Sequence, residues 1–513
     1  MAGHRRIGVT RLGATCGLLL VSAAASAQLR VVTWNVSNYS GGRADAIKTA
    51  VYGVYEGRSM APDIILGQEF LSLAAVNEFV QHLNAAPGSP GDWWRTWVGS
   101  SARAEGNVMF YRYTKLEYKS FAVASSAGPR STIRYKVVPI GYNSPRATLW
   151  LYNGHLKAGD SSSDRAQREA ACAEIRENAA GLDAGWHYLF GADFNIKSSG
   201  RSSYQELVGN PTAPGHFNDP INTPGSWNNN CNYRIVHTQD PIGPGGMDDR
   251  YDQILVSDTL VDGDGFEYVG LSFLPYSTTT WDDPFHSYRA WGNDGTNCNG
   301  PLVTTDNTMV GPEIAQAIID CAAGAGHIPV FLDLRLPPVV ASDGVIDFGT
   351  IPQGGTAEAV LSVWNAGDVV LWGDGGIADL AYELTTTAGF TPPPGDFEAV
   401  AGTEPTQHVL TMDTSTIGPM NGILTILSNA ADEPEREVLL VGEIAPSDCT
   451  GDVNCSGAVD FADIDPFVAA LGYPDGDGWP FACPWLNADC DGDGDVTFDD
   501  IDPFVARIGA TCP

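Results

Sequence analysis

Basic residues are scarce in this chain. Its 513 residues include 28 Lys and Arg against 62 Asp and Glu, which gives a formal net charge of −34. Proteins that coat nucleic acid rely on many Lys and Arg contacts to phosphate, so this balance argues against a nucleic-acid coating role for the chain as a whole. Hydrophobic residues make up 43% and charged residues 18%, which argues against a wholly disordered acidic protein.

The chain also lacks an evident membrane-spanning segment. Residues 12–24 form an apolar run that is shorter than the roughly 20 residues a spanning helix needs. Basic residues precede this run, and Ala25-Ser26-Ala27 follows it, which is the pattern of a secretory signal peptide with its cleavage site. We therefore expect residues 1–27 to be removed and the mature chain to be secreted or associated with the cell surface.

Of the 10 cysteines, only Cys16 lies within the predicted signal peptide. Export permits disulfides among the others, although their pairing cannot be read from the sequence. Cys172 lies alone in an Ala-rich helical stretch and is the expected unpaired cysteine. We expect pairing within two groups, which are Cys231, Cys298 and Cys321, and Cys449, Cys455, Cys483, Cys490 and Cys512.

A chain of this length exceeds one ordinary hydrophobic core. Its composition changes at two Pro-containing boundaries, which predicts three domains: 28–335, 336–446 and 447–513. The first has a mixed α/β pattern, with helical spacing at 73–83. Its strand-like runs, several of which end in polar clusters, are 29–34, 64–66, 107–111, 147–153, 186–190, 253–256 and 328–332.

Residues 336–446 contain almost no helical pattern. Strand-like runs at 357–364, 423–427 and 438–441 alternate with turn-forming residues, which predicts an all-β domain. The segments FGTIPQGG, WNAGD and GILTILSN resemble the immunoglobulin-like β-sandwich modules that bacterial secreted proteins place between catalytic and anchoring parts. The resemblance implies a spacer or a binding module.

The last domain contains an internal repeat. DVNCSGAVDFADIDPFVAAL at Asp452 returns as DCDGDGDVTFDDIDPFVARI at Asp489. Both copies match the calcium-loop pattern, in which oxygen ligands alternate along the loop and a glycine allows the sharp turn. The predicted Ca²⁺ ligands are Asp452, Asn454, Ser456, Asp460 and Asp463 in the first loop, and Asp489, Asp491, Asp493, Asp495 (by its backbone), Thr497 and Asp500 in the second.

These two loops, each followed by an apolar helical pattern, resemble a type I dockerin. The resemblance implies a small α-helical, EF-hand-like domain with two Ca²⁺ sites. It also implies that residues 447–513 bind a cohesin-like or cell-surface partner. Ser456 departs from the pattern, because an acidic or amide residue is commoner at that position, so the first loop is expected to bind Ca²⁺ more weakly.

Polar residues follow the strand-like runs of the first domain in a distinctive order. Carboxylates, amides and histidines at strand ends suit metal-assisted hydrolysis of a phosphodiester, which needs a cation, an activated water and a proton donor. The motifs are VVTWNVSNY with Asn35, PDIILGQEF with Glu69, LYNGHLKAG with His155, LFGADFN with Asp193 and Asn195, DDRYDQILVS with Asp252, and GHIPVFLDL with His327.

Taken in this order, the motifs resemble the endonuclease/exonuclease/phosphatase superfamily. The resemblance implies two packed β-sheets flanked by helices, as in DNase I, and a Mg²⁺ or Mn²⁺ cofactor held by Glu69 with Asn35 beside it. Asp193 would orient the attacking water, and Asn195 would hold the phosphate. His155 and His327 would contact the scissile phosphate. Asp252 would support His327, as Glu105 would support His155.

Gly326 stands where the superfamily usually has an aspartate before the last histidine, which favours chemistry with one metal ion. The resulting prediction is a secreted, metal-dependent phosphodiesterase, a nuclease acting on extracellular DNA or RNA. Two alternatives stay open: a phosphoesterase of phospholipids or sugar phosphates, and a catalytically degenerate adhesion or scaffold component. Except for Arg436 and Arg507, every Lys and Arg after residue 27 lies in residues 28–335, so the overall acidity does not exclude a nucleic-acid substrate there.

Overall fold

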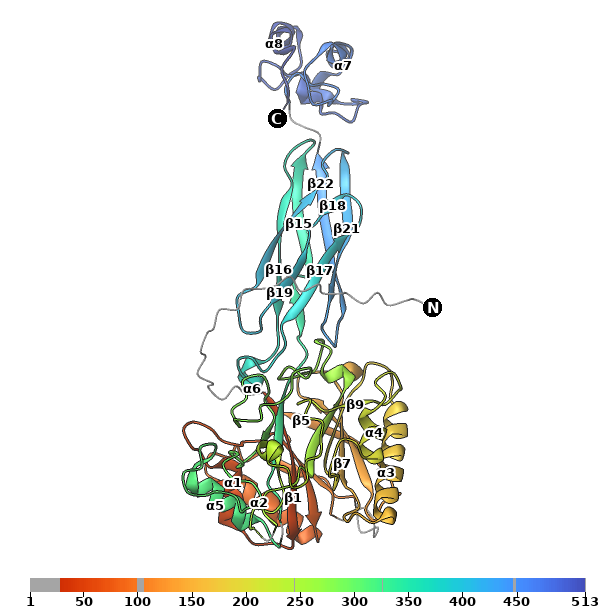
Figure 1. The fold of residues 1–513 in the computed structure, drawn as a ribbon. Coiled ribbons are helices and arrows are strands. Elements are labelled where there is room, and N and C mark those ends of the chain that lie inside the picture. The colour runs from red at the N-terminus through yellow and green to blue at the C-terminus, as the bar shows by residue number, and fades with distance from the viewer. Residues whose placement is uncertain (1–27, 99–105, 244, 325, 446–448, 513) are drawn as a thin grey trace.

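A computed structural model describes residues 28–98, 106–243, 245–324, 326–445 and 449–512. The predicted signal peptide and Glu105 therefore lie outside the described residues. No helix among the described residues is long and apolar enough to cross a membrane. Figure 1 shows an α/β region followed by an elongated β region and then by a small helical region that ends the chain.

The first region contains two β-sheets. In the first sheet the strand order is β11-β13-β1-β2-β4-β3, with β12 also paired to β13, and in the second it is β5-β6-β7-β8-β10-β9. The first sheet consists of β1 (Leu29–Tyr39), β2 (Ile64–Phe70), β3 (Trp93–Arg95), β4 (Val108–Arg112), β11 (Glu267–Tyr268), β12 (Arg289–Ala290) and β13 (Val330–Arg335). The second consists of β5 (Leu116–Ser125), β6 (Thr132–Pro139), β7 (Leu149–His155), β8 (His187–Asp193), β9 (Phe217–Asn218) and β10 (Asp252–Ser257).

The two sheets pack face to face, with β1 and β2 against β7, β8 and β10. Gly191 of β8 permits this approach, since a Cβ there would lie 2.8 Å from a methyl group of Leu66. Helices flank the sheets on their outer sides (Figure 1). They are α1 (Ala44–Tyr52), α2 (Leu73–Asn84) and α5 (Gly311–Cys321) beside the first sheet, and α3 (Ser162–Ala180) and α4 (Ser202–Val208) beside the second.

Each predicted strand-like run of this region contains a strand, but several strands extend further at their C-terminal ends. β1, β7 and β8 include the polar residues that follow the apolar runs. The ladder pairs His155 with Asp193 and Asp193 with Asp252, so three candidate site residues occupy one row across neighbouring strands. The mixed α/β architecture predicted for this region is therefore present.

The second region is built from two further sheets, with strand orders β14-β16-β20-β18 and β15-β22-β21-β17-β19. These strands are β14 (Val340–Ser342), β15 (Val345–Pro352), β16 (Glu358–Asn365), β17 (Leu380–Thr386), β18 (Phe390–Thr391), β19 (Asp396–Ala399), β20 (Thr406–Met412), β21 (Gly418–Ser428) and β22 (Glu435–Ala445). The region is β-rich as predicted, apart from the short helix α6 (Val369–Trp372). Trp372 of that helix is buried in the hydrophobic core of the first region, so the two regions share packing.

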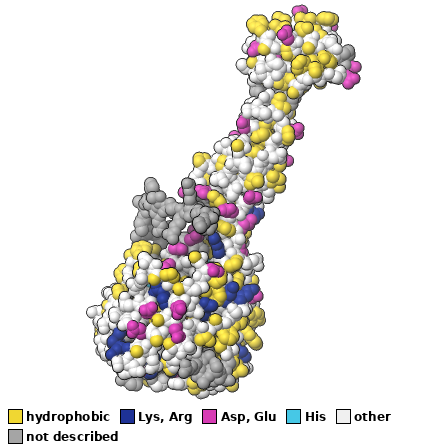
Figure 2. Space-filling view, turned by 90° about the vertical axis from the view of Figure 1, so that its right-hand side faces the viewer, with side chains coloured by type: hydrophobic (Ala, Val, Ile, Leu, Met, Phe, Trp, Pro, Cys, Tyr) yellow, Lys and Arg dark blue, Asp and Glu magenta, His cyan; other side chains and the backbone are white. Residues whose placement is uncertain are grey.

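The third region contains two short helices, α7 (Ile464–Ala470) and α8 (Ile501–Arg507). They occupy equivalent positions in the sequence repeat, and the rings of Phe467 and Phe504 stack with centroids 4.3 Å apart. Figure 2 shows Lys and Arg side chains mainly over the first region, and apolar side chains on the surface of the third.

Disulfides join Cys231 to Cys298, Cys449 to Cys512, and Cys455 to Cys483. Pairing within the two predicted groups is therefore confirmed, and Cys172 is unpaired as expected. The prediction of a single unpaired cysteine was wrong, because Cys321 and Cys490 are also free. Both side chains are buried in hydrophobic cores, where a thiol packs as a small apolar group.

Candidate functional site

The predicted site residues of the first region come together where the two sheets meet. Asp193 is at the centre of the group and is almost fully buried. Its Oδ2 lies 3.1 Å from Nδ2 of Asn35, 3.3 Å from Nε2 of His155 and 3.6 Å from Nε2 of His327. Burial raises the pKa of Asp193, but the two histidines and its hydrogen bonds outweigh burial and keep the pKa below its usual value.

His327 is held by a second carboxylate. Its Nδ1 lies 2.7 Å from Oδ2 of Asp252, which also accepts a 2.8 Å hydrogen bond from the hydroxyl of Thr238. Burial lowers the pKa of His327, but Asp252 and Asp193 outweigh burial and raise it. The imidazole therefore faces Asp193 through Nε2 in a fixed orientation, and sequence reasoning did not identify Thr238 as part of this support.

His155 lies between Asp193 and Glu69. Its Nδ1 is buried, has no hydrogen-bond partner among the described residues and is 3.6 Å from Oε1 of Glu69. Burial lowers the pKa of His155, which favours the neutral ring, and Asp193 opposes that shift. Glu105, the predicted support for this histidine, lies outside the described residues.

Glu69 adopts a left-handed backbone conformation, with φ of 63°. Its carboxylate accepts hydrogen bonds from the backbone N–H of Asn38 at 2.7 Å and from Nδ2 of Asn35 at 3.1 Å. Non-glycine residues adopt this conformation at a cost, and it is concentrated at functional sites. The oxygens of Glu69 and Asp193 are hard ligands of the kind that Mg²⁺ accepts, so the residues fit a divalent cation.

The two amide side chains of the candidate site, Asn35 and Asn195, both form hydrogen bonds within the protein. Asn35 presents its Nδ2 to both carboxylates, while its Oδ1 accepts the backbone N–H of Ser37 at 3.0 Å. In this orientation the Nδ2 group of Asn35 positions Glu69 and Asp193. Asn195 donates from Nδ2 to Asp193 at 2.9 Å and to the carbonyl of Leu156 at 3.3 Å, so its amide hydrogens are engaged within the protein.

Steric crowding explains why a glycine occupies position 326, where the superfamily usually has an aspartate. Its φ is 66°, and a Cβ at this position would lie 2.3 Å from Cβ of Ala322. An aspartate could not fit here without a shift of the backbone, so no carboxylate reaches the site from this position. The carbonyl of Gly326 instead accepts the backbone N–H of Asp240 at 3.1 Å.

Only one of two nearby arginines is free to face a substrate. The guanidinium of Arg134 lies 4.4 Å from the ring of Trp150 and donates to Asn178 at 2.8 Å, which is a structural arrangement. The charge of Arg130 lowers the pKa of His155, so this side chain lies near the site. Arg130 is therefore the arginine that could contact a phosphate.

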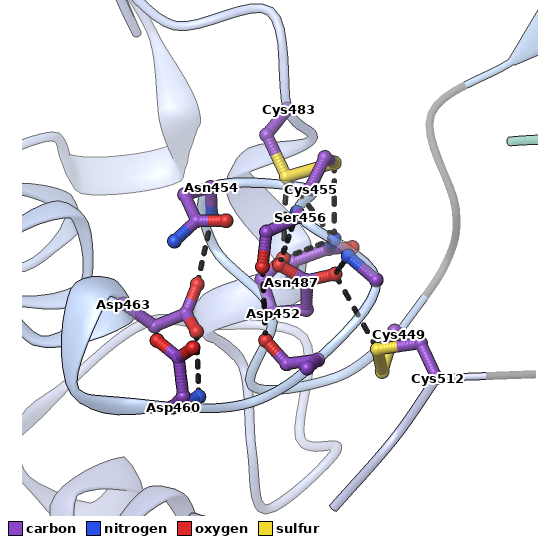
Figure 3. The surroundings of a disulfide bond; sticks show 12 residues. Cys449, Asp452, Asn454, Cys455, Ser456, Asp460, Asp463, Cys483, Asn487 and Cys512 are labelled. Atoms are coloured by element: carbon purple, nitrogen blue, oxygen red, sulfur yellow. Dashed lines mark hydrogen bonds between the residues drawn. A yellow bond between two sulfur atoms is a disulfide. The ribbon is translucent and has the colours of Figure 1, made fainter. Parts of the chain in front are cut away.

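The first calcium-like loop of the third region is ordered around two carboxylates. Asp452 accepts the backbone N–H groups of Ser456 and Gly457, and Asp463 accepts those of Asn454 and Asp460. Oδ1 of Asn454 is buried and has no hydrogen-bond partner among the described residues, so this oxygen is available as a ligand. Figure 3 shows these loop side chains on one turn of the chain, beside the Cys449–Cys512 and Cys455–Cys483 disulfides.

The second loop repeats this arrangement. Asp489 accepts the backbone N–H groups of Gly492 and Gly494, and Asp500 accepts those of Cys490, Asp491 and Thr497. Carboxylate oxygens of Asp489, Asp491 and Asp493 lie within 4.8 Å of one another. Burial and its acidic neighbours raise the pKa of Asp491. This oxygen-only set suits Ca²⁺.

Some of the predicted calcium ligands also stabilise the loop backbone. Asp460 and Thr497, at the equivalent position of the two loops, each cap the short helical turn that follows by accepting a backbone N–H group. Asp495 donates its backbone N–H to Asp493 at 3.0 Å. The loop backbone is thus fixed by the same side chains that would bind the ion.

No protein-family model matches the chain, and no curated protein matches it. Several solved structures are similar to it. They include the human Nocturnin catalytic domain with bound sulfate (11% identity, 61% of this chain and 96% of that chain, TM-score 0.35). An endonuclease/exonuclease/phosphatase from Beutenbergia cavernae is similar at 14% identity, over 80% of this chain and 99% of that chain, with a TM-score of 0.33.

A third similar structure is TDP2 of D. rerio in complex with a single-stranded DNA product (11% identity, 60% of this chain, 98% of that chain, TM-score 0.34). These neighbours include a protein of the superfamily that the motifs resemble. At these identities and TM-scores, the similarities transfer neither activity nor substrate to this chain. The immunoglobulin-like and dockerin-like interpretations of the other two regions stay predictions.

Proposed function

We propose that the chain is a secreted, metal-dependent phosphodiesterase that hydrolyses extracellular DNA or RNA and is held at a surface by its third region. One observation carries the catalytic proposal. A single buried carboxylate, Asp193, faces His155, His327 and Asn35, with Glu69 beside them. This combination provides an acid, a base and a charged group around one position, as hydrolysis of a phosphodiester requires.

Within this site each residue has a distinct task. Asp193 would accept a hydrogen bond from the attacking water and orient it towards phosphorus. His327, held by Asp252, would stabilise the charge that develops on the phosphate oxygens. His155 would transfer a proton at Nε2. Glu69 would hold Mg²⁺ or Mn²⁺, which supplies charge neutralisation at the phosphate when bound.

The distribution of basic residues favours a polyanionic substrate. Lys157 and Lys197 follow the strands that carry His155 and Asp193, and Arg130 acts on His155. Two further arginines, Arg165 and Arg201, lie in the same part of the surface, where they pair with Asp160. Lys and Arg side chains next to a phosphate site are the ordinary means of binding a nucleic-acid backbone.

The third region would provide attachment. Its two loops would bind Ca²⁺ through the ligand sets described above. Equivalent apolar residues of the two repeats lie on its surface, since Phe461 and Phe498 are each 78% exposed and Val468 and Val505 are more than half exposed. Exposed apolar patches of this kind mark interaction sites, here for a cohesin-like or cell-surface partner. The second region would act as a spacer.

The test uses the mature chain, residues 28–513, with Mg²⁺ or Mn²⁺. Plasmid DNA, RNA, sphingomyelin and inositol phosphates would be supplied separately, and products measured. We expect cleavage of nucleic acid, and a loss of roughly 10²–10⁴-fold in rate for His155→Asn. His187→Asn is the matched control, because His187 is a buried histidine at the opposite end of β8 from Asp193.

Three results would contradict parts of this proposal. Cleavage of sphingomyelin or inositol phosphates instead of nucleic acid would replace the substrate. No cleavage of any substrate would favour the adhesion or scaffold alternative. Equal rates for His155→Asn and the wild type would exclude the proposed site even if cleavage occurred.

A further inference from the structure

Two buried amide side chains join the two sheets of the first region. Gln68 of β2 and Asn153 of β7 belong to different sheets, and both are fully buried. Nε2 of Gln68 lies 2.8 Å from Oδ1 of Asn153, to which it donates a hydrogen bond. The same nitrogen donates to the carbonyl of Leu66 at 2.8 Å and is 3.1 Å from Oγ1 of Thr33. Burying amide groups is costly unless they are hydrogen-bonded, so these bonds make the two side chains tolerable here.

The side chain of Asn153 bonds to two strands of the opposite sheet. Its Nδ2 donates to the carbonyls of Gly67 and Val108, each at 3.1 Å, and its Oδ1 accepts the hydrogen bond from Gln68. Gly67 and Gln68 lie on β2, whereas Val108 begins β4, the neighbouring strand of the first sheet. The amide of Asn153 therefore fixes β7 against both β2 and β4.

Two residues of the candidate active site follow these amides on the same strands. Glu69 comes directly after Gln68 on β2, and His155 comes two residues after Asn153 on β7. Oε1 of Glu69 and Nδ1 of His155 are 3.6 Å apart across the two sheets, and this Nδ1 has no hydrogen-bond partner among the described residues. Because no hydrogen bond joins the pair, the packing of β2 on β7 sets the distance between them.

Stability alone does not account for this polar contact. Oε1 of Gln68 is buried and has no hydrogen-bond partner among the described residues, which is a cost to folding. Replacing two hydrogen-bonded side chains by apolar ones of the same shape can be nearly neutral or even stabilising. What the two amides add is direction, because a hydrogen bond restricts distance and angle, whereas apolar contact is not directional.

We propose that Gln68 and Asn153 are positioning residues of the candidate active site. Their hydrogen bonds fix β2 against β7, and so set the distance of the Glu69 carboxylate from the His155 imidazole. Neither amide touches the substrate, and both act through the residues that follow them. The inference rests on the proposed phosphodiesterase function for its effect on rate, but the binding of a divalent cation at Glu69 can be measured without any cleavage.

The test compares the double variant Gln68→Met, Asn153→Leu with the wild type, both as the mature chain. Side-chain size is nearly kept, so the melting temperature should stay close to that of the wild type. Mn²⁺ binding is followed by electron paramagnetic resonance, and the ion that Glu69→Gln removes identifies the site. Affinity for that ion should fall roughly 10–100-fold, and kcat should fall roughly 10²-fold with KM nearly unchanged.

Asn84→Leu is the matched control. Oδ1 of Asn84 in α2 accepts the backbone N–H of Trp93 at 2.8 Å, and its Nδ2 donates to the carbonyl of Trp93 at 3.2 Å. The variant therefore also breaks an amide contact between two elements, but at β3, the edge strand of the first sheet. It should lower the melting temperature and leave kcat and the affinity for Mn²⁺ unchanged.

An exchange of the two amides covers the case in which the apolar double variant does not fold. Gln68→Asn shortens one side chain and Asn153→Gln lengthens the other, so the combined variant keeps the total length of the contact. It should bind Mn²⁺ more tightly than Gln68→Asn alone, by roughly tenfold. A combined variant no better than the single one would contradict the proposal.

Other results would also overturn it. One is wild-type kcat and Mn²⁺ affinity in the apolar double variant, and another is a wild type from which Glu69→Gln removes no Mn²⁺. If the wild type cleaves no substrate, the proposed function fails, and the Mn²⁺ affinities alone then decide whether the two amides position Glu69.

Discussion

The carboxylates of the candidate active site and those of the C-terminal loops are stabilised in different ways. Asp193 and Asp252 face histidine, amide and hydroxyl side chains. In residues 449–512, which the structure describes, the central carboxylates accept only backbone N–H groups and form no ion pair. Asp193 and Asp252 therefore have side-chain partners within the chain, whereas the C-terminal loops leave negative charge for an ion.

The largest effect is expected at the centre of the active site. Asp193→Asn keeps the size of the side chain but removes the charge that would orient water between His155 and His327. We expect the cleavage rate to fall roughly 10²–10⁴-fold, with the calcium content unchanged. Initial rates at saturating metal, and ion counts on the same sample, measure both. A rate within a few-fold of the wild type would show that Asp193 has no catalytic task.

A second prediction concerns a carboxylate of the first region that is neutralised by the chain itself. Arg250 is fully buried and donates to both oxygens of Asp219, at 2.7 and 2.8 Å. Arg250→Met should destabilise the first region by about 3–5 kcal/mol, because it leaves Asp219 without its cation. Denaturant unfolding measures this loss, which calcium should not repair.

The double variant Arg250→Met, Asp219→Asn is the control for this effect. It removes the unpaired charge together with its partner, so it should recover a large part of the lost stability. If the single variant were as stable as the wild type, the first region would not depend on ion pairs within the chain, and the contrast with the C-terminal loops would disappear.

Calcium removal tests whether the C-terminal loops depend on a bound ion. Chelation should lower the stability of residues 449–512, by about 2.7 kcal/mol per site when calcium had been present at 100 times its dissociation constant. Circular dichroism during heating should show the transition of the helices α7 and α8 move, and an unmoved transition would contradict the calcium-loop interpretation.

The contrast between the regions also explains what the sequence could predict. The calcium-like loops are local, so their residue spacing alone was enough to predict ligand positions, and these stay predictions. Part of the candidate site was predictable because His155 and Asp193 end their strands, and the ladder places them in one row with Asp252, the first residue of β10. The mixed α/β character of the first region and the β-rich character of the second followed from the periodicity of their apolar residues, which is also a local property of the sequence.

Features that depend on long-range packing were not predictable. The steric reason for Gly326 lies in its contact with Ala322, and the orientation of the Asn35 amide depends on Ser37 and two carboxylates. The burial of Trp372 in the first region also crosses a boundary that composition had placed at residue 336.

The smallest predicted effect distinguishes the two C-terminal loops from each other. Ser456 occupies the position that Asp493 holds in the second loop, so the first loop has one carboxylate fewer. Ser456→Asp should raise the calcium affinity of the first loop by roughly tenfold, since ligand charge tunes such sites. Without calcium the same change should destabilise the loop, because the new carboxylate lies near Asp452, whose Oδ1 accepts the backbone N–H of Ser456 at 2.9 Å.

Titration calorimetry measures the change in calcium affinity, and melting curves recorded with a chelator measure the change in stability without calcium. The reverse variant Asp493→Ser is the matched control in the second loop. An effect of the same sign with and without calcium would mean that charge at this position acts on folding alone. The loops would then resemble Asp219, which Arg250 neutralises within the chain, and the distinction between the two kinds of acidic site would fail at this position.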